Sequence, residues 1–132
     1  MIGEVSALAF ASEAAALRVA ELVQEACEAH LDLSRDEADA AAVAVEFASS
    51  QAQIVVTEQV QRAASTIFNA LGASSTRKGL QLDRHWRNAR TISSHNPVIY
   101  KSRIVGDWEI NGTVPEFMWR AGDAPGTTSA GA

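Results

Sequence analysis

The chain has 132 residues, the size of one small domain, and its hydrophobic content of 47% predicts a packed core. The net charge of −5 argues against general nucleic-acid binding, the single Cys27 excludes an internal disulfide, and no run is apolar enough to predict a membrane span. A lone cysteine and the absence of a basic leader predict a cytoplasmic protein. The cysteine and the histidines show no metal-ligand spacing, so we predict no metal site.

The first half of the chain predicts two long antiparallel helices. Residues 4–30 place apolar side chains along one stripe and contain no Gly or Pro. Residues 34–71 repeat the apolar three-four spacing without a breaker, and Ser34 with Glu37 forms an S-x-x-E capping box. At 1.5 Å per residue the second helix would be about 55 Å long. Such a rod needs partners along its length, and Gly72 is expected to end it in a left-handed conformation.

Charge is separated along the chain. Residues 1–47 carry ten acidic residues against Arg18 and Arg35, a net of −8, whereas residues 77–90 carry five basic residues against Asp83, a net of +4. A local basic patch suits an anionic group, such as a cofactor phosphate or an acidic partner surface. It also suits a solvated helix face with internal ion pairs, for example between Asp83 and Arg87.

The segment 72–79, GASSTRKG, is a small-residue loop with two cations. Backbone N–H groups in such a loop can bind a phosphate, and Arg77 and Lys78 would add charge. A loop of this composition can equally do no more than connect two helices.

Residues 82–97, LDRHWRNARTISSHNP, predict a short two-sided helix. Leu82, Trp86 and Ala89 share its apolar stripe, so Trp86 is expected in the core. Pro97 disfavours helical geometry in the preceding residue, so the helix should end by Asn96. His95 then lies at the helix end, where its side chain can cap the helix C-terminus or face a cavity.

After Pro97 the pattern predicts a short helix over residues 98–105, broken by Gly106 and by the Asn111-Gly112 turn. The aromatic residues beyond it, Trp108, Phe117 and Trp119, predict an irregular, extended tail that packs on something, and residues 121–132 are expected to be disordered. The expected fold is therefore all-α, with one long helix too few for a four-helix bundle.

The motif RHWRNART followed by HNPV resembles the C-terminal domain of the acyl-CoA dehydrogenase-type flavin-dependent monooxygenases, of the dibenzothiophene monooxygenase type. The resemblance covers residues 3–119 and is most specific over 71–98. It implies that residues 1–120 form most of a C-terminal helical bundle. The first bundle helix and two preceding domains would then lie upstream of Met1 or on another polypeptide.

The resemblance also implies a flavin site. The cofactor would be reduced FMN or FAD supplied by a separate reductase, used with O₂ on a small organic substrate, sulfur compounds included. His95 matches the active-site histidine of these enzymes, although Ile92 stands where some relatives have a second histidine. The implied cofactor-binding residues are Ser74, Ser75, Arg77, Arg84, Arg87 and Arg90.

Two alternatives remain beside the monooxygenase. A true acyl-CoA dehydrogenase has the same fold but uses a glutamate base, and no acid occurs between Asp83 and Asp107. A non-catalytic helical module that pairs with another protein also fits the alanine-rich helices. The resemblance implies a homo-oligomer, a tetramer in the family, and a flavin reductase as partner, with no nucleic acid and no membrane. We expect the isolated chain to be inactive.

Overall fold

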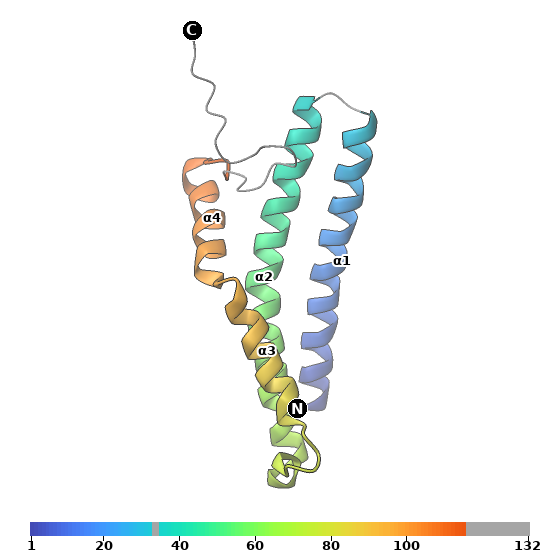
Figure 1. Ribbon diagram of the computed structural model, residues 1–132, viewed down its shortest axis with the longest axis vertical. Helices are drawn as coiled ribbons and strands as arrows, with labels where there is room; N and C mark the ends of the chain where they lie inside the picture. The colour runs from blue at the N-terminus through green and yellow to red at the C-terminus, as the bar shows by residue number, and fades with distance from the viewer. Residues whose placement is uncertain (33–34, 116–132) are drawn as a thin grey trace.

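A computed structural model of the chain describes residues 1–32 and 35–115, and these residues form four α-helices and one 3₁₀ turn (Figure 1). The elements in chain order are α1 (Ile2–Asp32), α2 (Arg35–Leu71), η1 (Ala73–Thr76), α3 (Asp83–His95) and α4 (Val98–Asn111). The all-α prediction is confirmed. The expected disorder of residues 121–132, the aromatic residues Phe117 and Trp119, and the capping residue Ser34 lie outside the described residues.

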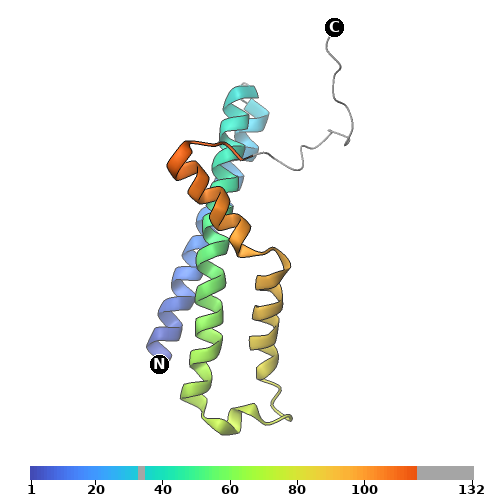
Figure 2. The same ribbon diagram turned by 90° about the vertical axis from the view of Figure 1, so that its left-hand side faces the viewer.

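Helix α2 is the centre of the arrangement and contacts each of the other elements. Helix α1 lies antiparallel along one side of α2, and α3 and then α4 return along another side (Figures 1 and 2). Two polar contacts fix the α1–α2 register: Ser12 Oγ donates to Gln59 Oε1 at 2.8 Å, and Arg62 Nη2 pairs with Glu4 Oε1 at 2.6 Å. The start of α1 therefore packs beside the second half of α2.

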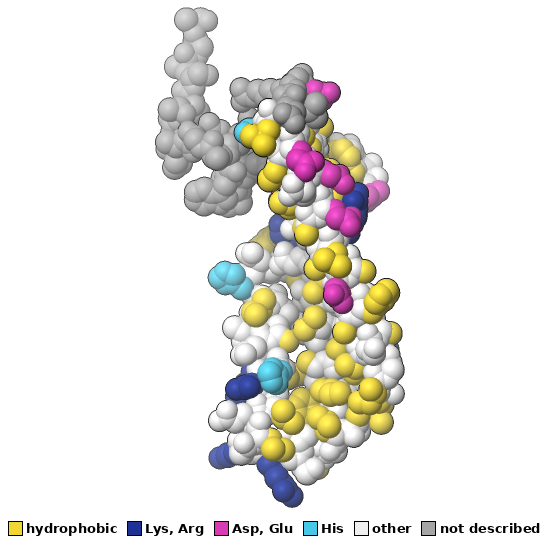
Figure 3. Space-filling view, turned by 90° about the vertical axis from the view of Figure 1, so that its right-hand side faces the viewer, with side chains coloured by type: hydrophobic (Ala, Val, Ile, Leu, Met, Phe, Trp, Pro, Cys, Tyr) yellow, Lys and Arg dark blue, Asp and Glu magenta, His cyan; other side chains and the backbone are white. Residues whose placement is uncertain are grey.

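The prediction of a packed core is wrong for the described residues, where Ala29 and Phe47 are the buried hydrophobic side chains. Helices that lie side by side around one central helix leave their outer faces uncovered. Apolar side chains gather over the N-terminal half of α1 (Figure 3), where Phe10 is 74% exposed. Exposed apolar faces of this kind are typical of surfaces that contact further protein.

Helix α2 also corrects the expectation that no run is apolar enough to span a membrane. Its segment Glu37–Leu71 is long and apolar enough to do so by length and composition alone. In the structure this helix has neighbours on more than one side, namely α1, α3 and α4. Only 11% of its apolar window is buried, however, so packing within the described residues does not account for the composition of this helix.

Gly72 ends α2 as predicted, but not in the left-handed helical conformation. Its φ of 73° and ψ of 178° lie in a region that is essentially restricted to glycine. At the next helix end, Asn96 is extended with φ of −114° and ψ of 104°, as the following proline requires. Helix α3 thus includes His95 as its last residue.

The predicted break at Gly106 is wrong, because α4 continues through it to Asn111. Glycine in a helix costs only about 1 kcal/mol, and contacts with α2 outweigh that cost. Trp108 stacks on Phe47 with ring centroids 4.6 Å apart, and Lys101 Nζ pairs with Glu46 Oε1 at 2.9 Å. Trp108 is therefore a helical packing residue and not part of an extended tail.

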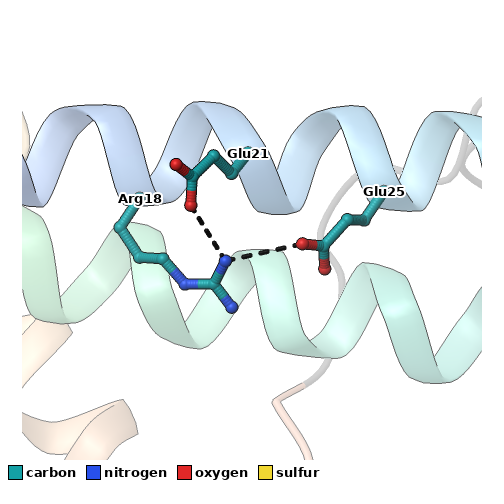
Figure 4. Close-up of polar contacts among 3 residues, drawn as sticks. All are labelled: Arg18, Glu21 and Glu25. Carbon is teal, nitrogen blue, oxygen red and sulfur yellow. Dashed lines mark hydrogen bonds and ion pairs between the residues drawn. The ribbon is translucent and has the colours of Figure 1, made fainter.

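The second half of α1 carries a solvated acidic face. Arg18 Nη1 lies 3.1 Å from Glu21 Oε2 and 3.4 Å from Glu25 Oε1 (Figure 4), and all three side chains are exposed. The hydrogen bond that Arg18 donates to Glu21, with further help from the nearby charge of Glu25, raises the pKa of Arg18 above its ordinary value. Cys27 on the same helix is exposed.

Candidate functional site

Helix α3 is attached to α2 largely through hydrogen bonds, because none of its residues is buried. Three side chains of α2 take part: Ser65 Oγ accepts from Trp86 Nε1 at 3.2 Å, Gln61 Oε1 accepts from Arg90 Nη1 at 2.6 Å, and Gln53 Nε2 donates to the Asn96 carbonyl at 2.9 Å. We call these three contacts the polar ladder.

Trp86 does not lie in a core as predicted. It is 44% exposed, and its indole nitrogen is used in the polar ladder. The apolar stripe of α3 does face α2, since Leu82 and Ala89 are half-buried. The stripe is too narrow to bury a whole tryptophan ring against one neighbouring helix.

A hollow of about 430 Å³ lies between α2 and α3 at the end of the polar ladder. We call it the His95 hollow. Its apolar lining is Val56, Val60, Ala89 and Ile92, and its polar lining is Gln53, Thr57, Ser93, His95 and Asn96. Its size is within the range of small-molecule sites, which combine an apolar surface with a few polar groups.

His95 is exposed at the end of α3 and lines two hollows. The second hollow, of about 750 Å³, also includes Arg90 and Trp86. Within the described part of the chain the His95 imidazole forms no hydrogen bond or ion pair. An imidazole without a protein partner is available to give or take a proton at a bound molecule.

The predicted cationic residues divide into two groups. Arg87 Nη1 pairs with Asp83 Oδ2 at 2.9 Å, as the i,i+4 spacing predicts, and Arg90 is engaged by Gln61. Arg77, Lys78 and Arg84 are exposed and have no side-chain partner among the residues that the structure describes. We call these three the basic cluster; Figure 3 shows Lys and Arg side chains at this end of the molecule.

The two serines predicted to bind a cofactor also differ in how accessible they are to a ligand. Ser75 is only 5% exposed, and its hydroxyl donates to the Gly72 carbonyl at 2.6 Å, so it stabilises the η1 turn. Ser74 is exposed, and its carbonyl accepts from the Arg77 backbone N–H at 3.3 Å. A bound anion would meet Ser74 before Ser75. The cofactor-binding role of both residues stays a prediction.

The predicted site residues do not all come together. Arg84 and His95 are eleven residues apart on one helix, which is about 16 Å along its axis. Of the predicted cations, Arg87 and Arg90 line the second hollow together with His95. The candidate site therefore has two parts, a basic end at the η1–α3 turn and a mixed apolar and polar end at His95.

Sequence reasoning missed the α2 side of this site. Gln53, Thr57, Gln61 and Ser65 follow one another at four-residue steps on a helix rich in alanine and valine. That spacing places them on one face, and all but Ser65 line a hollow next to α3. This repeat of polar residues at every fourth position was the sequence signal that α2 contributes polar side chains to the site. Over the described ranges, no three His, Cys, Asp or Glu side chains are grouped to hold a metal ion.

Comparison with known families gives one match that covers most of the chain. Residues 3–99 match the family described as acyl-CoA dehydrogenase, C-terminal domain. The matched range includes α1, α2, α3 and the start of α4, and therefore the whole of the His95 hollow.

Curated relatives are monooxygenases. The chain is 33% identical over 105 residues to a dibenzothiophene monooxygenase of Mycolicibacterium goodii, which is 80% of this chain and 24% of that protein. It is 43% identical over 49 residues to a probable FMNH₂-dependent monooxygenase, SfnC, of Pseudomonas putida, which is 37% of this chain and 12% of that protein. The chain thus spans a quarter or less of the length of these relatives.

Solved structures agree with the sequence matches. Methanesulfinate monooxygenase MsuC from Pseudomonas fluorescens superposes with a TM-score of 0.73 at 34% identity, over 87% of this chain and 29% of that one. FMN-bound TdsC from Paenibacillus sp. A11-2 superposes with a TM-score of 0.67 at 34% identity, over 86% of this chain and 27% of that one.

Proposed function

Since this chain belongs to the family of acyl-CoA dehydrogenase C-terminal domains, we propose that it is the flavin-contacting helical part of an FMN-dependent monooxygenase. The enzyme would use reduced flavin and O₂ to oxygenate a small organic compound, and sulfur compounds are the first class to test. The observation that carries the proposal is His95, which lies without a protein partner beside a hollow of ligand size in a chain homologous to FMNH₂-dependent monooxygenases.

The residues around His95 fit a flavin ring. A fused aromatic ring needs an apolar surface and a small number of hydrogen-bonding groups. Val56, Val60 and Ile92 supply the first, and Gln53 and Thr57 supply the second. FMN is supported over FAD because one relative is a probable FMNH₂-dependent monooxygenase and the similar structure of TdsC holds FMN.

The basic cluster would bind phosphate. Its three cations are exposed and have no partner to give up within the described residues, so a phosphate can be bound without breaking an ion pair. Arg87 and Arg90 each already use part of the guanidinium group in a contact with Asp83 or Gln61. We therefore assign phosphate binding to Arg77, Lys78 and Arg84.

Bound reduced flavin supplies the electrons that activate O₂. The role we assign to His95 is to hold or transfer a proton at its imidazole while oxygen is transferred to the substrate. Once further protein covers the hollow, its apolar side chains Val56, Val60 and Ile92 would exclude water from that region. No acidic residue lines the His95 hollow, which disfavours the glutamate-dependent chemistry of a true acyl-CoA dehydrogenase.

Both parts of the site are open to solvent, and the uncovered faces of α1, α3 and α4 need further protein. We propose that other domains of the oxygenase, and further copies in a homo-oligomer such as a tetramer, cover these faces and complete the pocket. A flavin reductase would supply the reduced cofactor, in the cytoplasm. The isolated 132 residues should then be inactive.

Turnover tests this proposal. The complete oxygenase, meaning this chain together with the domains that complete the pocket, is mixed with a flavin reductase, NADH, FMN and a panel of organic sulfur compounds. We expect oxygenated product from the complete protein and none from the isolated chain. Product from the isolated chain would refute the idea that other domains complete the pocket. If the correctly assembled protein turns over no compound of the panel, or does so without FMN, the monooxygenase proposal is refuted.

A further inference from the structure

We propose that Gln53 is a positioning residue for His95. Its side-chain amide fixes the turn between α3 and α4 and thereby sets where the imidazole lies over the hollow. The consequence for catalysis rests on the proposed function, whereas the effect on the turn does not.

The first observation is the hydrogen bond from Gln53 Nε2 to the Asn96 carbonyl oxygen, at 2.9 Å across 43 residues of sequence. Asn96 directly follows His95 and is extended, so the hydrogen-bond ladder of α3 stops here. The last carbonyl groups of a helix have no partner within the helix and need one from elsewhere. Gln53 supplies that partner from the central helix.

The second observation is that few other polar contacts hold this turn. Pro97 has no N–H to donate, and no residue of α3 is buried. The neighbouring cross-helix side-chain contacts are Arg90 with Gln61, five residues before His95, and Lys101 with Glu46, six residues after it. Loss of the Gln53 contact would leave about ten residues without a polar tie to α2.

The third observation is that Gln53 and His95 line the same hollow. The position of the turn relative to α2 is therefore also the position of the imidazole relative to that hollow. Displacement of a catalytic group by about 1 Å can lower a rate a hundredfold. Gln53 can affect the reaction in this way without contacting the reacting atoms.

Two substitutions of Gln53 test the role of its amide donor, and a substitution of Gln51 is the control. Gln53→Glu keeps the size of the side chain but replaces the donor with an acceptor, which cannot bond a carbonyl when ionised. Gln53→Lys keeps N–H donors on a side chain of similar reach. Gln51→Ala is the matched control, because Gln51 is exposed on the same helix and has no side-chain partner within the described residues.

Two measurements read the turn directly in the complete oxygenase. Hydrogen exchange by mass spectrometry follows peptides that span residues 92–99, and carbethoxylation by diethyl pyrocarbonate compares His95 with His85 as an internal reference. For Gln53→Glu we expect exchange in the turn to rise about fivefold, which is the usual net contribution of one hydrogen bond. The labelling rate of His95 should change by at least about twofold relative to His85, which lies in α3 outside the turn.

The rate of oxygenation is the third measurement. Gln53→Glu should lower kcat about tenfold and leave the KM for reduced FMN within about twofold, and Gln53→Lys should restore most of the exchange, labelling and rate. The proposal is overturned if Gln53→Glu leaves exchange and His95 labelling as in wild type, or if Gln51→Ala changes them equally. Altered labelling with unchanged kcat would uphold the positioning and refute the catalytic role of His95.

Discussion

Replacing Phe47 with alanine tests how much its aromatic contact with Trp108 contributes to holding α4 against α2. Phe47 is 9% exposed, and its ring lies 4.6 Å from that of Trp108, tilted by 40°. We expect Phe47→Ala to release α4, and with it the turn that carries His95, while α1 and α2 stay paired. The variant therefore separates α4 packing from the rest of the fold.

The size of the effect follows from burial. Removing a buried phenylalanine side chain costs about 3–5 kcal/mol. We take the lower value, about 3 kcal/mol, because Trp108 is itself 36% exposed and the contact is only partly enclosed. With a factor of ten for every 1.4 kcal/mol, the opening of α4 should become about a hundredfold more frequent.

Hydrogen exchange of the α4 amides, read by mass spectrometry, measures this opening. Leu80→Ala is the control, since it removes a large apolar side chain from a position that is 55% exposed and outside α4, and it should change exchange less than about threefold. Phe47→Leu, which keeps part of the apolar volume, should give an intermediate rate. Equal exchange in Phe47→Ala and wild type would refute the idea that this contact holds α4.

Two further predictions concern the surfaces of the molecule. Arg84→Ala should weaken FMN binding by the complete oxygenase about tenfold or more, because a charge-assisted contact to phosphate contributes roughly 1.5–3 kcal/mol. The control Arg103→Ala, at an exposed position of α4, should leave FMN affinity unchanged. If fluorescence titration gives equal FMN affinities for Arg84→Ala and wild type, the basic cluster does not bind the phosphate. The isolated chain should self-associate through its exposed apolar faces, and Phe10→Asp should reduce that association in sedimentation velocity; a wild-type chain that stays monomeric at all concentrations would contradict this.

Much of the architecture could be predicted from local patterns. The uninterrupted apolar spacing of residues 34–71 predicted the central helix, and Gly72 and Pro97 predicted where α2 and α3 end. These features depend on the backbone preferences of single residues, which the sequence states directly. The motif RHWRNART predicted the family because its residues are contiguous and can be recognised without knowing the fold.

The errors concern contacts between distant residues. Gly106 predicts a break, but Trp108 and Lys101 hold α4 against Phe47 and Glu46, which are more than fifty residues away. Composition predicted a packed core, whereas side-by-side helices bury few side chains. Nothing local distinguishes a face that packs within the chain from one that packs against another domain.

The candidate site was half predicted. His95 follows from the position of Pro97 and from the resemblance, and the cations follow from their clustering. The α2 residues Gln53 and Thr57 could not be assigned to the site, because their four-residue spacing shows a shared face but not which helix packs there. The sequence also does not show which arginines lack a partner, because the Asp83–Arg87 ion pair depends on the conformation of the two side chains.

The central claim is that His95 takes part in flavin-dependent oxygenation. The most direct measurement is the rate of product formation by the complete oxygenase carrying His95→Ala, with FMN binding and hydrogen peroxide release recorded alongside. General acid–base help is typically worth about 10² to 10⁴ in rate. We predict a loss of that order, with FMN affinity retained and a larger share of the reduced flavin lost as hydrogen peroxide. His85 is an exposed histidine of α3 that lines neither the His95 hollow nor the second hollow, so His85→Ala should stay within about twofold of wild type. A His95→Ala enzyme that binds FMN and forms product at the wild-type rate would contradict the account.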